Sequence, residues 1–206
     1  RIEALSANVV LAWGRGGTFP NYDDRVFRST DGGTSWSDLG EIMSEGVWAF
    51  ANVDGQTVVA CDNRGNMFQS TDEGESWAET FASPGPFPGF LSSATPQFAN
   101  ALTGYFGYGP GFAIKTTDSG ASWTQISSGS GQSLNDIDRF PDGTLIAVGE
   151  EGTVLRSDGA SAWLPTPQFT TTHLTAVDVV GANEVVVTTE NGLVYRSADG
   201  GDSWTA

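Results

Sequence analysis

The octapeptide STDGGTSW, residues Ser29–Trp36, returns in three close copies further along the chain. These copies are STDEGESW at Ser70–Trp77, TTDSGASW at Thr116–Trp123 and SADGGDSW at Ser197–Trp204. A fifth, incomplete version, SDGASAW, ends at Trp163. Self-similarity at a fixed period indicates stacked supersecondary units, so the spacing of the copies is the first guide to the fold.

The tryptophans that close the five copies are almost evenly spaced, at Trp36, Trp77, Trp123, Trp163 and Trp204. A unit of about 40 residues built from short runs of Val, Ile, Thr and aromatic residues is typical of a four-stranded propeller blade. The sequence therefore predicts an all-β protein, a β-propeller of five four-stranded antiparallel blades in a single domain, residues 1–206. A fragment of a larger ring, for example one of seven blades, is the alternative. The expected blades are approximately residues 1–45, 46–88, 89–132, 133–172 and 173–206.

A turn glycine supports this frame. In the second, fourth and fifth units, the second strand starts 12 residues before the octapeptide, which places Gly65, Gly152 and Gly192 just before the third strand. Gly111 takes the same place if the second strand of the third unit starts at Gly104. We expect the backbone at this turn to have φ > 0, which favours glycine.

The octapeptide is expected at the turn between the third and fourth strands. Its Asp can accept main-chain N–H bonds, its Gly tolerates the bend, and its Trp can cover the hairpin and pack towards the neighbouring unit. We expect the Asp carboxylates to be buried and structural. Calcium binding is a weaker hypothesis, because each turn offers one carboxylate and a calcium loop gathers several. The residues assigned this structural role are Asp31, Trp36, Asp72, Trp77, Asp118, Trp123, Asp158, Trp163, Asp199 and Trp204.

The pattern S-x-D-x-G-x-[ST]-W resembles the Asp-box, or BNR repeat, of sialidases, sortilin-type receptors, xyloglucan-hydrolysing propellers and photosystem II assembly factors. The assembly factors and sortilin-type propellers are nearest in style. The resemblance implies a β-propeller whose boxes lie at the blade periphery, away from any catalytic centre. In the fourth unit Ala160 and Ala162 replace the Gly and the Ser or Thr, so the hairpin of Asp158 is expected to be the least firmly held.

Composition narrows the function classes. A formal charge of −16, with nine Lys and Arg in total, argues against nucleic acid and anionic membrane surfaces as partners. The apolar runs are far shorter than a membrane span, so no direct membrane insertion is expected. The single Cys61 is expected as a small core residue, and the single His173 leaves no conventional metal site or Ser-His centre. We therefore expect no metal and no cofactor, and an extracellular or periplasmic location.

Two units depart from the repeat. In the first unit the second strand is expected to start at Val9, further from its octapeptide than in the other units, which puts eight extra residues in the loop 13–25. The link from the second to the third unit has five extra residues, within or just after residues 81–90. In an up-and-down blade both kinds of connection emerge on one face, opposite the octapeptide turns.

Both insertions are rich in aromatic residues held between Pro and Gly, which suits a binding face. The alternative is that these aromatic rings fold inward as a plug. Cations are scarce in this chain, and three of them, Arg15, Arg25 and Arg64, are expected on or near the same face. The candidate ligand-binding residues are Trp13, Phe19, Tyr22, Arg25, Arg64, Phe87, Phe90 and Tyr108.

Catalysis has weaker support than binding. The Arg-Ile-Pro signature of sialidases is absent, since Glu3 follows Arg1 and Ile2. Asp138 and Asp178 occupy equivalent positions in the first strands of the fourth and fifth units, and a carboxylate pair at the right separation can hydrolyse a glycosidic bond. The preferred hypothesis is a non-catalytic binding or scaffold propeller for a protein or glycan partner, either alone or as a module of a larger assembly. The alternative is a sialidase-like glycoside hydrolase or a fragment of one.

Overall fold

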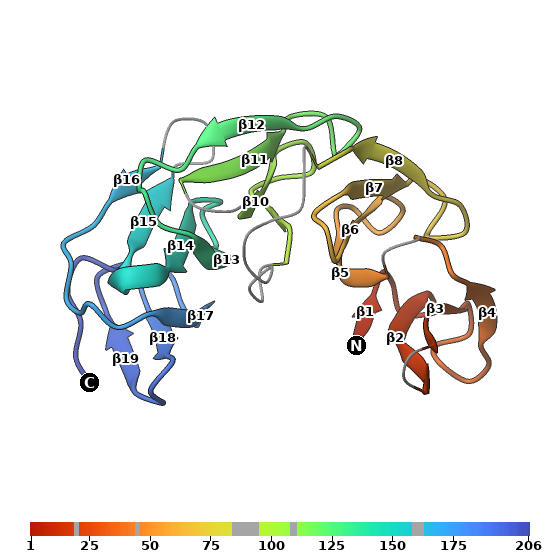
Figure 1. Cartoon of the computed structure of the whole chain (residues 1–206), viewed down its shortest axis with the longest axis horizontal. Coiled ribbons are helices and arrows are strands. Elements are labelled where there is room, and N and C mark those ends of the chain that lie inside the picture. The colour runs from red at the N-terminus through yellow and green to blue at the C-terminus, as the bar shows by residue number, and fades with distance from the viewer. Residues whose placement is uncertain (19–20, 44–45, 84–94, 108–110, 158–162) are drawn as a thin grey trace. The chain divides into compact units, whose positions relative to one another are not determined.

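The computed structural model of the chain describes residues 1–18, 21–43, 46–83, 95–107, 111–157 and 163–206, and only the backbone of residues 15–18 and 21–23. Within these residues the chain forms five antiparallel sheets whose strands follow chain order, as the ribbon colours show (Figure 1). The prediction of an all-β fold built from five successive antiparallel blades is confirmed, but the fifth described sheet has three strands and not the four that were predicted.

The blades are numbered in chain order. Blade 1 contains β1 (Ile2–Ala4), β2 (Val10–Thr18), β3 (Asn21–Ser29) and β4 (Ser37–Gly40). Blade 2 contains β5 (Val47–Asn52), β6 (Val58–Asp62), β7 (Met67–Ser70) and β8 (Ala78–Phe81). Blade 3 contains β9 (Gln97–Phe98), β10 (Gly104–Gly107), β11 (Phe112–Thr116) and β12 (Thr124–Ser127). Blade 4 contains β13 (Leu134–Arg139), β14 (Leu145–Gly149), β15 (Val154–Ser157) and β16 (Leu164–Pro165), with the 3-10 turn Glu150–Gly152 before β15.

Blade 5 contains β17 (Leu174–Val179), β18 (Val185–Thr189) and β19 (Val194–Ser197). In place of a fourth strand, Thr205 pairs with Arg196 in an isolated bridge, with N···O distances of 2.8 and 2.9 Å. The chain groups into two compact units. One is Arg1–Pro86 with Asp118–Ser122, and the other is Phe87–Thr117 with Trp123–Ala206.

Strand register confirms the repeat and corrects the predicted length of the insertion in blade 1. The first residue of the second strand lies opposite the first residue of the octapeptide, as in Val58↔Ser70 and Val185↔Ser197. In blade 1 the corresponding pair is Val10↔Ser29, so the strand frame starts at Val10 and not at Val9. The insertion in the β2–β3 hairpin of blade 1 is therefore one residue shorter than predicted, seven residues and not eight.

The turn glycines adopt the predicted conformation. Gly65, Gly111, Gly152 and Gly192 have φ of 81°, 79°, 69° and 82°, in the left-handed region. Gly152 also lacks room for a side chain, because a Cβ there would lie 1.9 Å from the carbonyl oxygen of Thr170. This position therefore needs glycine for both its backbone angle and its close approach to the link before blade 5.

Each blade has two faces. We call the face that carries the first residue of the second strand the leading face, and the opposite one the trailing face. The core forms where a trailing face meets the next leading face: Leu11 and Trp13 of blade 1 pack with Phe50 and Val58 of blade 2. Blades 4 and 5 repeat the arrangement, with Ile146, Val148 and Val154 against Val177, Val185 and Val187. The helices of the described residues include none long and apolar enough to cross a membrane.

Candidate functional site

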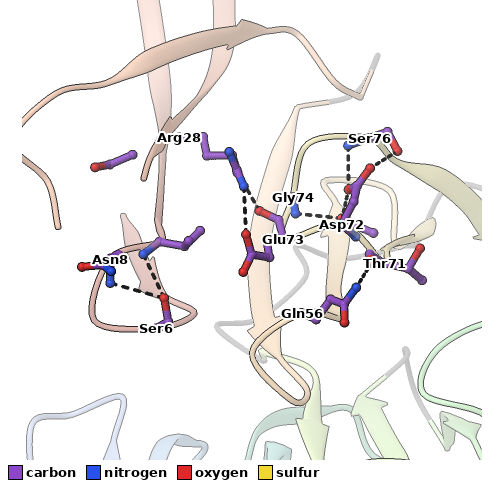
Figure 2. A network of polar contacts seen from close by, with 12 residues as sticks. Ser6, Asn8, Arg28, Gln56, Thr71, Asp72, Glu73, Gly74 and Ser76 are labelled. Atoms are coloured by element: carbon purple, nitrogen blue, oxygen red, sulfur yellow. Dashed lines mark hydrogen bonds and ion pairs between the residues drawn. The ribbon is translucent and has the colours of Figure 1, made fainter. Parts of the chain in front are cut away.

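The octapeptide turns share one hydrogen-bond pattern. In blade 2, the Ser70 hydroxyl donates to Asp72 Oδ1 at 2.7 Å and accepts the main-chain N–H of Gly74 at 2.8 Å. Asp72 then accepts the N–H of Ser76 at 2.9 Å and its hydroxyl at 2.5 Å (Figure 2). The same contacts recur around Asp31 and Asp199, and both bonds from Ser122 recur at Asp118. The octapeptide is thus a turn that is stabilised by hydrogen bonds between its own residues.

The buried member of this turn is the hydroxyl residue and not the carboxylate. Ser29, Ser70, Thr116 and Ser197 are each 1% exposed, whereas Asp31, Asp118 and Asp199 lie at the surface. The expectation of buried Asp side chains is therefore wrong, because the carboxylate receives its bonds from the outer side of the turn. Hydrogen bonds from Ser35 and Ser203 lower the pKa of Asp31 and Asp199 to about 2. At Asp72 burial opposes this effect, yet the bonds from Ser76 still lower the pKa to about 2.

The tryptophans close the turn. The indole Nε1 of Trp36, Trp77 and Trp204 donates to the carbonyl oxygen three residues earlier, at 3.0 to 3.1 Å. Trp77 stacks on Phe50 with ring centroids 5.2 Å apart, and Trp204 stacks on Phe169 at 4.8 Å. The predicted structural role of these rings agrees with this packing. Asp158 lies outside the described residues, so the expectation of a weaker fourth hairpin stays a prediction.

A polar contact that the sequence analysis missed links consecutive blades at the octapeptide side. Arg28, directly before the octapeptide of blade 1, donates from Nε to the carbonyl oxygen of Glu73 at 2.9 Å (Figure 2). Gln69, at the same position in blade 2, donates to the carbonyl oxygen of Ser119 at 3.0 Å. Glu73 and Ser119 both have left-handed backbones, with φ of 60° and 62°, which turn this carbonyl outward. A long donor side chain before each octapeptide was the available sequence signal.

Carboxylates make a second contact between blades on their first strands. Asp138 Oδ2 accepts the N–H of Val179 at 2.6 Å, and Asp136 Oδ2 accepts the N–H of Val177 at 3.0 Å. In blade 1, Glu3 holds the position of Asp138 and is hydrogen-bonded by the backbone of Asn52, the counterpart of Val179. A carboxylate that accepts a main-chain amide of the next blade is therefore a repeated structural device.

These carboxylates also carry the only large upward shift of an acidic pKa among the described residues. Burial raises the pKa of Asp136 to about 6, against the hydrogen bonds from Val177 and Ile137. Burial also raises the pKa of Asp138. Asp178, at the position in blade 5 that Asp138 holds in blade 4, lies at the surface. The expected equivalence of Asp138 and Asp178 is confirmed by register, and the bonds of Asp138 give it a structural role.

The insertion in blade 1 extends the β2–β3 hairpin. These strands pair from Val10↔Ser29 to Thr18↔Asn21, whereas the corresponding pairing in blade 2 stops at Cys61↔Met67. Outside strands cover only the base of this hairpin: β1 pairs with Val10–Ala12, and β4 pairs with Val26–Arg28. Among the described residues, no strand pairs with the outer edges of residues 14–25. Beyond its base, the hairpin therefore has no neighbouring strand among the described residues, and a strand edge of this kind can pair with a further strand.

The two kinds of turn separate onto opposite faces, as predicted. On one side, the octapeptide turn bonds to the turn between the first and second strands, for example Glu73 N–H to Gln56 O at 2.9 Å. On the other side, the turn before the third strand bonds to the link between blades, for example Asn63 N–H to Gly46 O at 3.3 Å. The main chain of Ser83, where the link after blade 2 begins, also bonds to Asn66 Oδ1 at 2.8 Å. We call this second side of blades 1 and 2 the loop face.

The loop face of blade 2 carries a firmly held turn, residues 62–66. Asp62 is 1% exposed, and its Oδ1 accepts the N–H groups of Arg64 and Asn66 at 2.8 and 2.9 Å. Its Oδ2 accepts the side-chain amide of Asn66 at 2.6 Å. This network holds the turn in place and presents Arg64, an exposed side chain, at its tip.

The candidate ligand residues fall into three groups. Trp13 is 8% exposed, packs edge-on against Phe50 at 4.5 Å and donates to the carbonyl oxygen of Trp48 at 3.3 Å, so the expectation of an exposed ring is wrong there. Arg25 is exposed and pairs with Asp38 at 3.0 Å. The side chain of Tyr22 is not described, and Phe19, Phe87, Phe90 and Tyr108 lie outside the described residues. Their part in binding, like that of Arg25 and Arg64, remains a prediction.

The single cysteine and the single histidine of the chain have different surroundings. Cys61 is fully buried in β6, as predicted, and its burial raises the thiol pKa to about 12. His173 accepts the N–H of Glu151 at Nδ1, at 3.1 Å, and so helps to join blades 4 and 5. In the described part of the chain, no three His, Cys, Asp or Glu side chains gather as a group able to hold a metal ion.

Comparison with known proteins gives the fold. No family model and no curated protein matches the chain. A solved YCF48 bound to a D1 peptide is 14% identical, has a TM-score of 0.68 and matches 99% of this chain and 80% of its own. The GH74 xyloglucanase from Xanthomonas campestris is 17% identical with a TM-score of 0.72, over 97% of this chain and 36% of that enzyme. The GH74 enzyme of Niastella koreensis is 23% identical with a TM-score of 0.63, over 89% and 29%.

The chain thus spans about a third of the length of the GH74 structures that it matches and four fifths of the YCF48 structure. At sequence identities this low, the likeness concerns architecture alone. The comparisons show that this chain has the fold of a β-propeller.

Proposed function

We propose that the protein is a non-catalytic propeller of the Asp-box type that binds a segment of a partner protein through the loop face of blades 1 and 2. The observation that carries the proposal is the extended β2–β3 hairpin, whose outer edges are not paired with any strand of the described residues. An extended peptide can add to such an edge as a further strand, with main-chain bonds for affinity and side-chain contacts for specificity.

Charge and rigidity support the same face. Arg25 lies in the hairpin and Arg64 at the tip of the neighbouring turn, in a chain whose net charge is −16. Two of the few cations therefore stand near one edge, where they favour an acidic segment. The octapeptide turns lie on the opposite side and stabilise the blades. A YCF48 of the same fold has been solved with a D1 peptide bound, so the fold itself accommodates a peptide ligand.

The test uses the repeat as its own control. In the shortened variant, residues 14–25 are replaced by the five-residue turn of blade 2, DNRGN, which removes the seven extra residues. Random linear peptides are selected by phage display against the wild-type protein and then offered to the variant. We expect selected peptides, enriched in Asp and Glu, to bind the wild type and to lose affinity at least tenfold for the variant. Peptides that bind both proteins equally, or ligands found only on a glycan array, would contradict the proposal.

Glycoside hydrolysis is the second candidate, and the raised pKa of Asp136 favours it, since a general acid needs a pKa near the working pH. The bonds from Val177 and Ile137 to this carboxylate point to a structural role instead. A panel of fluorogenic glycosides separates the two functions. Turnover that disappears in Asp136→Asn and Asp138→Asn would establish hydrolysis and overturn the binding-only function. An extracellular or periplasmic location and a place in a larger assembly remain part of the proposal.

A further inference from the structure

The β2–β3 hairpin of blade 1 contacts blade 2 through the carboxylate of Asp24. Asp24 lies on β3 two residues before Val26, so the two side chains share the trailing face. Val26 is fully buried in the core that blades 1 and 2 share. Further along the hairpin, Asp24 reaches Gly46, the residue before β5, where an added Cβ would lie 2.7 Å from the Asp24 carboxyl carbon and closer still to Oδ2. The carboxylate therefore occupies the space that a side chain at position 46 would need.

The firmly held turn 62–66 of blade 2 reaches the same point. The side-chain nitrogen of Asn63 would lie 2.9 Å from a Cβ at Gly46, and the main-chain N–H of Asn63 donates to the Gly46 carbonyl oxygen at 3.3 Å. Gly46 itself is buried, and Arg64, the exposed tip of the turn, directly follows Asn63. The hairpin, the link between the blades and the turn therefore meet at Gly46, one residue away from Arg64.

The place of Gly46 carries a side chain where the preceding hairpin is short. Strand register makes Ser133 of blade 4 and His173 of blade 5 the counterparts of Gly46. The corresponding hairpins of blades 3 and 4 each have four residue pairs, whereas the hairpin of blade 1 has nine. The ring of His173 accepts the N–H of Glu151 from the turn of the preceding hairpin. This place thus faces the preceding hairpin, and it is glycine where that hairpin is long.

We propose that the β2–β3 hairpin and the turn 62–66 form one preformed binding surface for an acidic protein segment, and that Asp24 and Gly46 are its positioning residues. The inference rests on the proposed function and says how that site is held together. The contact of Asp24 fixes the hairpin against blade 2, so one ligand meets its strand edge and Arg64 together. A surface that is ordered before binding loses less conformational entropy, which strengthens binding. Arg25 and Arg64, in a chain of charge −16, favour an acidic ligand.

Two glycines of blades 1 and 2 give a matched pair for the test. Gly46 and Gly40 both have left-handed backbones, with φ of 72° and 75°, but a Cβ at Gly40 would have nothing within 4 Å. Gly46→Ala therefore displaces Asp24, whereas Gly40→Ala adds a similar backbone strain alone. Hydrogen exchange of the main-chain amides in residues 14–25 needs no ligand. We expect exchange at least tenfold faster in Gly46→Ala and in Asp24→Ala, and unchanged exchange in Gly40→Ala.

Binding is measured by calorimetry with an acidic peptide selected from the linear library against the wild type. Gly46→Ala and Asp24→Ala should each weaken its affinity about tenfold, and the double variant no more than either one, because both changes break the same contact. The loss of the Asp24 charge by itself would strengthen the binding of an acidic peptide, so a weaker affinity reports the lost position.

Several outcomes would overturn the proposal. These are unchanged hydrogen exchange of the hairpin in both variants, equal effects of Gly40→Ala and Gly46→Ala, and additive losses of affinity in the double variant. Should Gly46→Ala not fold, Asp24→Ala, which only removes atoms, carries both measurements. A library that yields no peptide for the wild type would overturn the proposed function and the ligand of this surface, and the exchange data would still confirm or overturn the positioning contact.

Discussion

Arg28 of blade 1 donates to the main-chain oxygen of Glu73 in blade 2, and its guanidinium also pairs with the carboxylate of the same residue at 3.1 Å. The side chain of Arg28 is 14% exposed and that of Glu73 is 41% exposed. The first bond is thus shielded from water, and the second lies at the surface. This contact shows how the repeat joins blades. The side chain of the residue before one octapeptide donates a hydrogen bond to a main-chain carbonyl oxygen in the octapeptide of the next blade.

Arg28→Ala should destabilise the protein by roughly 1–3 kcal/mol, because the outward carbonyl of Glu73 loses a charged donor. Glu73→Ala keeps that carbonyl, so its cost should be below about 1 kcal/mol. Arg25→Ala is the matched control on the same strand, since its pair with Asp38 is exposed on both sides. Urea unfolding measures all three, and equal losses in Arg28→Ala and Arg25→Ala would contradict this explanation.

Within the octapeptide, Ser70→Ala should cost roughly 1–3 kcal/mol, because the buried N–H of Gly74 then has no acceptor. Ser76→Ala changes the same residue type in the same turn, but its hydroxyl lies at the surface, and we expect a loss below about 1 kcal/mol. The difference in urea midpoint between the two variants gives the result. A larger loss in Ser76→Ala would mean that the carboxylate side of the turn is the stabilising one.

Lowering the pH from about 4 to 2 should reduce the contribution of the octapeptide turns to the stability of the protein. The pKa of Asp72 is lowered from 3.8 to about 2, so its contribution is complete above about pH 4 and disappears as the pH falls through 2. Asp31 and Asp199 behave alike. Urea unfolding between pH 2 and pH 5 should therefore show a steeper loss of stability in the wild type than in Asp72→Asn. Parallel curves would show that the hydrogen bonds of the turn do not favour the ionised carboxylate.

Asp136 should produce the opposite slope at higher pH. Its folded pKa of about 6 lies above the ordinary value of 3.8, so its contribution is complete below about pH 4 and is lost as the pH rises through 6. Raising the pH from 5 to 7 should cost on the order of 1 kcal/mol in the wild type and much less in Asp136→Asn. Thermal melts across this range test the sign, and a wild type that gains stability from pH 5 to pH 7 would contradict it.

The repeat made most of the fold predictable. The interval between octapeptides indicated the blades, and the constant spacing within the units placed Gly65 and its counterparts at a turn with positive φ, as found. The exposure of Asp31 was not predictable from the motif, because the same bonds form whether the carboxylate or the serine faces inward. Trp13 was misplaced because the extension of β2 and β3 continues the sheet, and its ring stays in the core at the base of the hairpin.

The contacts between blades were missed for a different reason. Arg28 and Gln69 share a position and a long donor side chain, which the sequence does show, but the main-chain carbonyl that they reach carries no sequence signal. Asp136 could have been noticed beside Asp138, since the two alternate on one strand, but its raised pKa depends on burial by the next blade. The contacts between blades and the raised pKa of Asp136 depend on how one blade packs against the next, and the sequence of a single blade does not show them.

The central claim, that the long connections of the loop face bind a protein segment, is tested most directly by one titration. A library-selected peptide is titrated calorimetrically into the wild type and into the double variant Phe19→Ala and Tyr22→Ala, each with its melting temperature known. If these rings contact the ligand, affinity falls at least 100-fold while the melting temperature stays within about 2 °C. If they form an internal plug, the melting temperature drops by ten degrees or more, and unchanged affinity in the stable variant would contradict the account outright.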